Sequence, residues 1–397
     1  MREKNIAPAA ERILQAAIQL QPAIRESRDE IEQGRRLPMH LVEKMKQAGI
    51  FGMAMPREWG GPQLDPISQL RVVEALTVAD ASVGWCAMIN CMGAYSTSFL
   101  DQKVARAMYP DLNLPTAGSL TLMGRALRVD GGYRVSGRWQ FGSGCQHSAW
   151  IQAGCIVHDE RGPRSRPDGT PETRQCLVPA SDVQILDTWY TTGLRGTGSN
   201  DFALNDCFVP EERTFSFQEP KFYRTGGLYT FPFNILYPFG GPALGVARAA
   251  IDALIDAGGK PARASTVGGS IRPAHQLRDE EYVQAAVGRA ELMLCAARSC
   301  LFDTVAELYD AFSDQRPIPP RLGAQFAAVH PYVYETCAEV VQLIYKARGG
   351  SAVYTSGVLD RCLRDAMAMN EHAINSLKFY NMAGRLLLGL PAEEFLF

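Results

Sequence analysis

The sequence predicts an α+β protein in three parts: an N-terminal α-helical domain over 1–114, a central β-barrel-like domain over 115–222 and a C-terminal four-helix bundle over 223–397. Two observations predict this order. The spacing of apolar residues is helical at both ends of the chain and changes to a period of two in the middle. The chain has 397 residues, which is too long for one ordinary hydrophobic core, so several domains are expected.

Helical spacing covers three segments of the first part. They are "AAERILQAAIQLQPAIRESRDEIEQ", "PMHLVEKMKQAGIFGM" and "PISQLRVVEALTVADASVGWCAMINCMGAYSTSFL". The prolines and glycines of "PREWGGPQLD" at 56–65 separate the second segment from the third, because both residue types interrupt helices. We therefore expect an all-helical domain before the β region.

Alternating apolar and polar residues mark the middle part. In "GRALRVDGGYRVSGRWQF" two alternating runs flank Asp130, Gly131 and Gly132, which favour the positive φ angles of a hairpin turn. Further strands are expected in "SAWIQAGCIV", "TRQCLVPASDVQIL" and "NDFALNDCFVPEERTF", with a long polar loop, "DERGPRSRPDGTPE", between two of them. Together these runs predict a β domain.

The helical spacing returns from about residue 233 in four long segments joined by glycine and proline linkers. They are "GPALGVARAAIDALIDAG", "DEEYVQAAVGRAELMLCAARSCLFDTVAELYDAF", "RLGAQFAAVHPYVYETCAEVVQLIYKARGG" and "GVLDRCLRDAMAMNEHAINSLKFYNMAGRLLLG". Four consecutive long helices predict a four-helix bundle.

The composition is typical of a soluble globular protein and excludes several partners. The formal net charge is -2, which leaves no basic excess for nucleic acid. The N-terminus lacks the apolar core of a signal peptide and no apolar run is long enough to span a bilayer, so we expect a cytoplasmic protein without a membrane partner. The 10 cysteines form no CxxC or paired metal motif, which predicts free thiols and no metal site.

Several motifs resemble those of the acyl-CoA dehydrogenase superfamily, in the same order and over almost the whole chain. They are "FGMAMPREWGGPQLD", "ADASVGW", "GGYRVSGRWQFGSG", "GLRGTGSNDFALNDCFVPEERTF" and "ARGGSAVYTSGVLDRCLRDAMA". Each motif is weakly specific by itself, whereas five in order are a strong match. The resemblance implies the acyl-CoA dehydrogenase fold and a flavin cofactor.

The segment "WQFGSG" at 139–144 matches the part of the family that runs along the flavin ring. The resemblance implies that Phe141 flanks the isoalloxazine and that the Ser143 hydroxyl reaches flavin N5. A strand period of two would put both side chains on one face, and Gly142 and Gly144 would let a ligand approach the backbone closely. An ordinary strand end with a polar tip is the alternative.

The superfamily contains two chemistries, and a catalytic carboxylate separates them. An acyl-CoA dehydrogenase needs a glutamate base at the substrate α-carbon. In the register set by "RDA" at 364–366 that position holds Ala373, and the alternative position before "GGP" holds Asn234. Both carboxylate positions are therefore empty, although a shifted register would bring Glu371 close to one of them.

The pattern instead resembles the flavin-dependent monooxygenases of the same fold, the oxygenase components of two-component systems. The resemblance implies a separate NAD(P)H:flavin reductase that supplies FMNH2 or FADH2, and O2 that adds to flavin C4a to give a hydroperoxide. The enzyme would then oxygenate a small aromatic or polycyclic substrate. Because the hydroperoxide loses H2O2 in water, the site must exclude solvent and hold N5–H with an acceptor, the role expected of Ser143.

A histidine near the end of the chain is the second expected catalytic residue. His372 stands where the dehydrogenases have a tyrosine, and the resemblance implies that it lies on the last bundle helix and activates a phenol or handles the peroxide protons. Imidazole suits this task because its unperturbed pKa of about 6.5 lies near neutral pH. A histidine that only packs in the core is the alternative. His147 is a weaker candidate with a structural explanation.

The flavin phosphate needs cations or backbone N–H groups. "GLRGTGS" at 193–199 offers a turn of small residues with exposed amides and hydroxyls, in which Arg195, Thr197 and Ser199 either contact the ligand or hold the strand. The resemblance adds candidates from the bundle, at the boundary with a neighbouring subunit: Arg263, Arg272, Gln284, Gly349 and Gly350. A helix cap is the alternative for Gln284 and for the two glycines.

The expected substrate pocket is apolar and aromatic. Its candidate walls are Trp85, Met88, Met92, Phe233, Asn234, Tyr237 and Met369, with Trp59 as a further candidate. Core packing is the alternative for Trp85. Family members usually assemble as dimers of dimers, so a homotetramer is expected, and the apolar C-terminal segment "GRLLLGLPAEEFLF" fits such an interface.

Three other functions stay open at this point. An FAD-dependent acyl-CoA dehydrogenase would hold FAD tightly and would be reduced by an acyl-CoA, but the missing glutamates argue against it. A non-catalytic scaffold would bind no flavin, but the retained flavin motifs argue against it. An amine or amino-sugar N-oxygenase would share the flavin chemistry and differ in its pocket.

Overall fold

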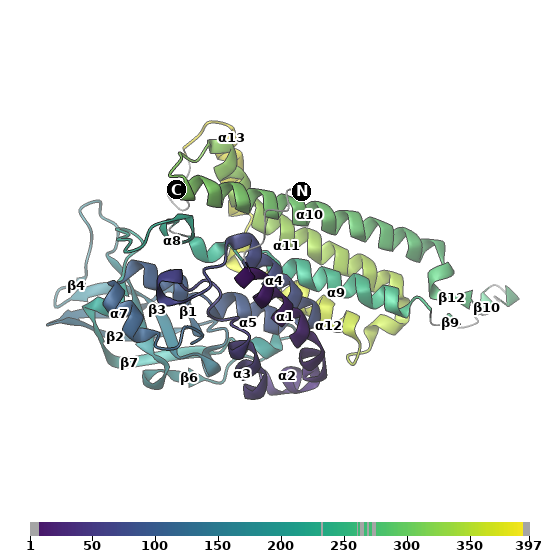
Figure 1. Cartoon of the computed structure of the whole chain (residues 1–397), viewed down its shortest axis with the longest axis horizontal. Coiled ribbons are helices and arrows are strands. Elements are labelled where there is room, and N and C mark those ends of the chain that lie inside the picture. Colours follow the sequence, from purple (N-terminus) through teal and green to yellow (C-terminus); the bar gives the residue numbers. More distant parts are fainter. Residues whose placement is uncertain are drawn as a thin grey trace.

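The computed structural model describes residues 8–231, 233–259, 261–262, 266–267, 270–271 and 275–391. In this part of the chain, helices precede and follow a central sheet, so the fold class expected from the sequence is confirmed. Figure 1 shows the sheet toward one end of the molecule and the long C-terminal helices toward the other. The N-terminal helices lie between them and contact both.

The N-terminal part is helical. Its helices are α1 (Pro8–Glu26), α2 (Arg28–Gly34), α3 (Met39–Gln47), α4 (Pro66–Ala79), α5 (Ala81–Asn90), α6 (Gly93–Ser96) and α7 (Gln102–Met108), with short turns η1 (Arg57–Trp59) and η2 (Thr97–Phe99). The third helical segment is divided at Asp80, whose side chain accepts the N–H groups of Ser82 and Val83 and thereby caps α5. This cap fixes the start of the helix that carries Trp85.

The central part is a mixed sheet. Its strands are β1 (Thr116–Val129), β2 (Gly132–Trp139), β3 (Trp150–Asp159), β4 (Gly162–Pro163), β5 (Thr173–Pro179), β6 (Gln184–Leu186), β7 (Asp201–Pro210) and β8 (Thr214–Phe215). The strand order is β6-β7-β2-β1-β3-β5-β8, with β4 paired to β3. β1 and β3 are parallel, whereas the other neighbours are antiparallel. Short turns η3 (Cys145–His147), η4 (Ala180–Asp182), η5 (Arg195–Thr197) and η6 (Glu211–Arg213) connect these strands.

The predicted hairpin between β1 and β2 is confirmed. Gly131 adopts φ 73° in the turn, and the two strands pair antiparallel. β2 also pairs with β7, and this pairing ends where Trp139 lies opposite Phe202. The strand therefore stops two residues before Phe141, so the next segment follows its own path.

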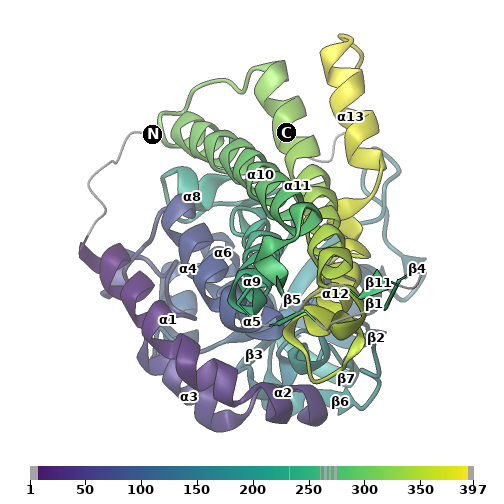
Figure 2. The same cartoon turned by 90° about the vertical axis from the view of Figure 1, so that its right-hand side faces the viewer.

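The C-terminal part contains α8 (Gly227–Thr230), η7 (Asn234–Leu236), α9 (Gly241–Ala257), η8 (Leu277–Asp279), α10 (Glu281–Ser313), α11 (Pro320–Arg348), η9 (Gly349–Val353), α12 (Val358–Asn370), η10 (Ala373–Asn375) and α13 (Lys378–Leu387). β9 (Pro261–Ala262) pairs with β12 (His275–Gln276), and β10 (Thr266–Val267) pairs with β11 (Ser270–Ile271). The expectation of one long fourth helix is wrong, because the chain is extended at His372 and divides that segment into α12 and α13. Figure 2 shows α13 beside α11, to which Tyr380 is hydrogen-bonded through Glu335.

The helices α4, α5 and α9 pack closely where the parts of the molecule meet. An added Cβ at Gly84 of α5 would lie 1.8 Å from Thr77 Oγ1 of α4, and one at Gly245 of α9 would lie 2.4 Å from Thr77 Cβ. These helices therefore approach more closely than a larger residue would allow. In the part of the chain that the structure describes, no helix combines the length and the apolar character needed to cross a bilayer.

Candidate active site

Ser143 lies within a chain of hydrogen bonds between three segments. Trp85 Nε1 of α5 donates to Ser143 Oγ at 3.1 Å, and Ser143 Oγ lies 2.7 Å from Ser199 Oγ. Ser199 Oγ lies 2.6 Å from Thr197 Oγ1, which donates to Leu194 O at 2.8 Å. We call this the hydroxyl chain. It joins α5, the segment after β2 and the turn around η5, and its three hydroxyl residues are buried.

The two ends of the hydroxyl chain fix the direction of every hydrogen bond in it. An indole N–H can only donate, and a carbonyl oxygen can only accept. Because Thr197 gives its one hydroxyl proton to Leu194 O, Ser199 must donate to Thr197 and Ser143 must donate to Ser199. Among the described residues, Ser143 thus has its proton engaged and keeps one lone pair. A ligand that binds Ser143 Oγ must be a hydrogen-bond donor.

Phe141 and Ser143 do not share a strand face, which corrects the expectation from the sequence. Phe141 adopts φ 64° and is 63% exposed, whereas Ser143 is buried. The segment turns because Gly142 N donates to Asn200 O at 3.1 Å and Ser143 N donates to Phe141 O at 2.9 Å. This turn sends the ring outward and the hydroxyl inward.

Internal packing is sufficient to explain the two glycines of this turn. A Cβ at Gly142 would lie 3.0 Å from Asn200 O, and one at Gly144 would lie 2.3 Å from Asn90 Oδ1. Gly144 also adopts φ 72°, which favours glycine. Asn90 Nδ2 donates to Ser143 O at 3.1 Å, so the same contact fixes the position of the serine.

Phe141 presents an exposed ring beside the buried hydroxyl chain. The ring lies edge-on to Trp189, with 6.2 Å between the centroids. Trp189 Nε1 donates to Leu194 O at 2.9 Å, so the carbonyl that ends the hydroxyl chain also holds this indole. A left-handed, exposed phenylalanine is unusual and marks a candidate binding position. An aromatic surface next to a buried acceptor fits a planar heterocycle that carries an N–H.

His372 lies in the turn after α12, not on the last bundle helix as expected. Its Nδ1 accepts the Ile374 N–H at 3.3 Å, so the neutral ring carries its proton on Nε2. The ring centroid lies 5.5 Å from that of Trp85 and 5.2 Å from that of Phe239. Burial lowers the pKa of His372 to about 4. At neutral pH the side chain is therefore an uncharged donor that packs against Trp85, the partner of Ser143.

His147 supports the position of Ser143. Its Nε2 lies 2.9 Å from Asn90 Oδ1, and the amide of Asn90 donates to the carbonyl oxygens of Ser143 and Thr116. Burial lowers the pKa of His147 to about 4, so the ring is neutral and donates to Asn90. These contacts agree with a structural explanation for this histidine.

The turn over 193–199 is mostly buried, which corrects the expectation of exposed amides and hydroxyls. The hydroxyls of Thr197 and Ser199 are engaged in the hydroxyl chain. Arg195 Nε donates to Glu32 O at 3.2 Å and its Nη1 donates to Thr191 O at 3.0 Å. Arg195 was expected either to contact the ligand or to hold the strand. These hydrogen bonds support the second alternative, in which Arg195 holds the turn against α2.

The bundle candidates have local explanations where the structure describes them. Gln284 is exposed and its Nε2 donates to Arg278 O at 3.0 Å, as a helix-end residue does. Gly349 ends α11 with φ 69°, the geometry of a C-cap, and both Gly349 and Gly350 are exposed. Arg263 and Arg272 lie outside the described residues.

The structure places the expected pocket residues in different surroundings. Trp85 contacts both Ser143 and His372, although it is buried as core packing would require. Phe233 and Tyr237 instead contact the ring of Phe231, at centroid distances of 6.2 and 5.3 Å. The other candidates that are buried are Met88, Met92, Asn234 and Met369. Trp59 packs under the guanidinium of Arg224, 4.0 Å from its Cζ.

Sequence reasoning missed two carboxyls that bind the segments around this site. Asp365 Oδ1 accepts the Leu194 N–H at 2.7 Å, and Asp80 caps α5. An aspartate before "ASVGW" is a typical N-cap residue, and that signal could have identified Asp80. For Asp365 the sequence offers only its place in "RDA", because its partner lies 171 positions away.

Two family descriptions match the chain. "Acyl-CoA dehydrogenase, N-terminal domain" matches residues 3–103, and "Acyl-CoA dehydrogenase, C-terminal domain" matches residues 237–377. The flavin-dependent monooxygenase oxygenase subunit HsaA of Mycobacterium tuberculosis (strain ATCC 25618 / H37Rv) is 30% identical over 97% of each chain. The oxygenase component of an FADH(2)-dependent resorcinol hydroxylase of Rhizobium sp. is 29% identical, over 93% of this chain and 92% of the relative.

Solved structures give a similar result. The crystal structure of the HsaA monooxygenase from M. tuberculosis superposes with a TM-score of 0.84 and 26% identity, and covers 98% of this chain and 100% of its own. XiaF from Streptomyces sp., solved with FADH2 and glycerol, superposes with a TM-score of 0.86 over 98% of each chain. At 22% identity this second protein shows a shared fold.

Proposed function

The chain belongs to the flavin-dependent monooxygenases with the acyl-CoA dehydrogenase fold, and from this premise we propose that it is the oxygenase component of a two-component system. A separate NAD(P)H-dependent reductase would supply reduced flavin, and the oxygenase would use O2 to hydroxylate a small aromatic molecule. The observation that carries the proposal is the hydroxyl chain, which leaves Ser143 able to bind only a donor.

Reduced flavin, when bound, supplies the activation of O2, and the residues of this chain hold it and keep water out. Ser143 is proposed to accept the N5–H of the reduced flavin, with its own proton committed to Ser199. Oxidised flavin has no proton at N5, so its N5 atom and Ser143 Oγ would both be acceptors and could not form a hydrogen bond. The hydroxyl chain therefore favours the reduced over the oxidised cofactor, which is the preference that a two-component oxygenase requires. Phe141 is proposed to support the flavin ring.

His372 is proposed to act as a hydrogen-bond donor from Nε2 to an oxygen atom of the substrate. Its Nδ1 is occupied by the Ile374 N–H, and burial keeps the ring neutral because it lowers the pKa to about 4. His372→Ala should therefore reduce product formation while the affinity for reduced flavin changes less than twofold. Equal product yields would leave His372 as a packing residue.

The proposed substrate is a small aromatic molecule with a ring hydroxyl. The name of one relative specifies resorcinol, a phenol, as its substrate. In this chain the rings of Trp85 and Phe239 flank His372, which fits a planar apolar substrate whose oxygen meets the imidazole.

Acyl-CoA oxidation has no support from the side chains at the two family positions for its base. Asn234 and Ala373 occupy those positions and carry no carboxyl group. Glu371 is the C-cap residue of α12 and its side chain is exposed. A base needs a desolvated place at the substrate carbon, so a shifted register does not restore one here.

A homotetramer is proposed for the assembled protein. Leu377, Leu387 and Leu388 at the two ends of α13 are 74%, 65% and 77% exposed. Exposed leucines at both ends of one helix are unfavourable on a monomer in water and are typical of an association surface. The end of the expected interface, over 392–397, lies outside the described residues.

The test combines the purified protein with a flavin reductase, FMN or FAD, NADH and isotopically labelled O2, with a panel of phenols as substrates. A hydroxylated product that carries one labelled oxygen atom is expected, together with H2O2 release in the absence of substrate. A protein that arrives with tightly bound FAD, is bleached by an acyl-CoA and oxygenates no phenol would contradict the proposal.

A further inference from the structure

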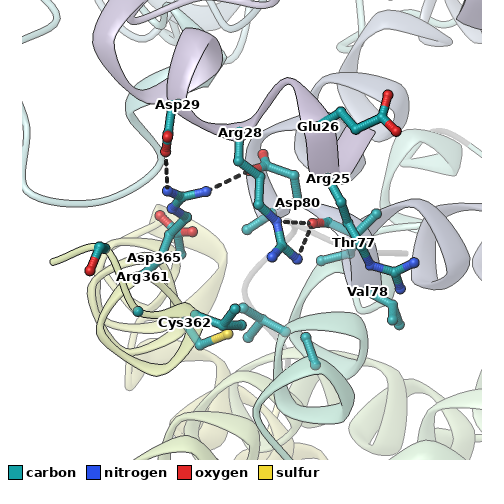
Figure 3. A pocket seen from close by; sticks show the side chains of 17 residues that line it. Arg25, Glu26, Arg28, Asp29, Thr77, Val78, Asp80, Arg361, Cys362 and Asp365 are labelled. Carbon is teal, nitrogen blue, oxygen red and sulfur yellow. Dashed lines mark hydrogen bonds and ion pairs between the residues drawn. The ribbon is translucent and has the colours of Figure 1, made fainter. Parts of the chain in front are cut away.

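A charged cavity lies beside the segments that carry the hydroxyl chain. It has a volume of about 140 Å³, and residues of α2, α12 and the junction of α4 with α5 line it (Figure 3). Two of its lining residues, Asp80 and Asp365, are buried carboxyls. Each of the two also accepts a backbone N–H from a segment of the candidate active site.

Asp365 is joined to the hydroxyl chain through one peptide group. Its Oδ1 accepts the N–H of Leu194 at 2.7 Å, while the carbonyl of Leu194 accepts the proton of Thr197 Oγ1 at 2.8 Å. Leu194 adopts φ 50°, so the turn depends on such side-chain bonds. The turn also packs directly on α12, because a Cβ at Gly193 would lie 2.1 Å from Arg364 O. A displacement of Asp365 therefore moves the end of the hydroxyl chain.

Asp80 fixes the opposite end of the hydroxyl chain. Its Oδ1 accepts the N–H groups of Ser82 at 2.9 Å and Val83 at 3.3 Å, and thereby anchors the first turn of the helix that carries Trp85. That first turn packs on η5, since a Cβ at Gly196 would lie 3.0 Å from Ser82 Cβ. The two carboxyls thus hold the two segments between which Ser143 is bound.

The two carboxyls have different charged neighbours around the cavity. The charged and titratable groups around them are Arg25 and Glu26 from α1, Arg28, Asp29 and Glu32 from α2, and Arg361, Cys362 and Arg364 from α12. Arg361 Nη1 lies 4.0 Å from Asp80 Oδ2, an ion pair marked by a dashed line in Figure 3. Arg364 instead binds Asp360 and Glu32. Burial, with the charge of Asp80, raises the pKa of Asp365 to about 7. Burial also raises the pKa of Asp80, against the opposing charges of Arg361 and Arg28.

We propose that Asp365 is a positioning residue for Ser143, and that loss of its proton tightens the turn over 193–199 and with it the hold of Ser143 on reduced flavin. An ionised carboxylate accepts the Leu194 N–H more strongly than a neutral carboxyl does. The fraction of turnover lost as H2O2 should therefore fall as pH rises through about 7. The catalytic consequence of this inference rests on the proposed function. The link from Asp365 to the turn over 193–199 does not.

The test uses three variants of the full chain. Asp365→Asn keeps an acceptor for Leu194 and cannot ionise, whereas Asp365→Ala removes the acceptor. Asp101→Asn is the matched control, because Asp101 caps α7 by accepting the N–H of Lys103 in an exposed place. Amide hydrogen exchange of the segment over 188–200, without flavin, reports the turn, and the ratio of H2O2 to product between pH 6 and pH 8 reports catalysis.

Asp365→Ala should raise exchange in that segment by about tenfold, which is the effect of losing one buried hydrogen bond. Asp365→Asn should keep near wild-type exchange at pH 6 and lose the pH dependence of the H2O2 ratio. Unchanged exchange in Asp365→Ala, or a wild-type pH profile in Asp365→Asn, would overturn the inference. If Asp365→Ala does not fold, the pH profile of Asp365→Asn decides whether the inference holds.

The two readouts separate this inference from the proposed function. Faster exchange in Asp365→Ala, in a protein whose wild type oxygenates nothing, would reject the function and keep the link to the turn. Oxygenation by the wild type with exchange that does not respond to Asp365 would reject the link and keep the function.

Discussion

Ser143 owes its proposed role to the two groups that bind it. Trp85 donates to its oxygen and Ser199 takes its proton, so its remaining lone pair faces any ligand. A free serine hydroxyl can turn to donate or to accept, and would not distinguish reduced from oxidised flavin. The proposed selectivity for reduced flavin therefore depends on the hydroxyl chain as a unit rather than on the serine by itself.

Ser143→Ala should weaken the binding of reduced flavin about tenfold, the cost of one hydrogen bond, with little effect on oxidised flavin. It should also increase H2O2 release relative to product. Anaerobic titration of the two flavin forms measures the first effect, and a peroxide assay measures the second. Ser148→Ala is the control, because Ser148 Oγ donates to Gly144 O in the same segment. Equal losses for both flavin forms would remove Ser143 from this role.

The sequence selected candidate residues for this site but did not predict their geometry. The motifs identified Ser143, Thr197 and Ser199, which lie together in one hydrogen-bonded chain. The left-handed backbone of Phe141 was not predictable, because it follows from a contact of Gly142 with Asn200, 58 positions later in the chain. The link from Asp365 to Leu194 was hidden for the same reason. Local patterns do not report such long-range contacts.

At the scale of elements, α5 connects the core to the candidate site. Its N-terminus is capped by Asp80, its middle carries Trp85, and its last residue is Asn90, which binds Ser143 O. One face also packs on α4, where Gly84 meets Thr77. The position of this helix therefore sets the donor to the hydroxyl chain and the backbone of Ser143 at once.

Gly84→Ala should destabilise the protein by about 2 kcal/mol, because the new methyl group would lie 1.8 Å from Thr77 Oγ1 in a fully packed place. Gly288→Ala is the matched control on α10, where an added Cβ meets nothing within 4 Å. In that exposed helix interior, alanine should stabilise the protein by up to about 1 kcal/mol. Urea unfolding of both variants measures the difference. A neutral Gly84→Ala would mean that α4 and α5 separate at little cost.

The sequence predicted most helices and strands but not the break between α12 and α13. Apolar spacing continues across "NEHAINSLKFY", which contains no glycine or proline to interrupt it. Side chains make the break: Asn375 Nδ2 donates to Met369 O at 2.9 Å, and His372 Nδ1 accepts the Ile374 N–H at 3.3 Å. Polar side chains that replace backbone partners in this way compete with a helix. The break places His372 beside Trp85, so the unpredicted turn belongs to the candidate site.

For the molecule as a whole, three desolvated histidines predict how stability depends on pH. Burial lowers the pKa values of His147, His330 and His372 from 6.5 to about 4 each. The folded state thus binds fewer protons than the unfolded state between these values, so stability is greatest above pH 6.5 and falls as pH decreases toward 4. Asp365 contributes to stability with the opposite sign. Its pKa is raised from 3.8 to about 7, so its contribution to stability decreases as pH rises through this range.

His330→Asn tests this dependence away from the candidate site. His330 Nε2 donates to Leu236 O at 3.0 Å, and an asparagine amide retains a donor. The wild type should lose about 3 kcal/mol more than the variant between pH 7 and pH 4, the value of about 2.5 pKa units. Urea unfolding midpoints across that range measure the slope, with His40→Asn, on the exposed side of α3, as control. Parallel slopes for His330→Asn and the wild type would contradict the assignment.

The order of the three parts was predictable because a change of apolar period needs no long-range contact, whereas assembly depends on surfaces that only the folded chain defines. The proposed tetramer can be tested at α13, where Leu387 and Leu388 are 65% and 77% exposed. Leu387→Glu with Leu388→Glu should convert a tetramer into smaller species in light scattering, because buried carboxylates at an interface are costly. Met123→Glu, at a 62% exposed residue of β1, is the control and should leave the mass unchanged. A wild type that is monomeric at all concentrations, or a tetramer that tolerates both glutamates, would move the interface away from α13.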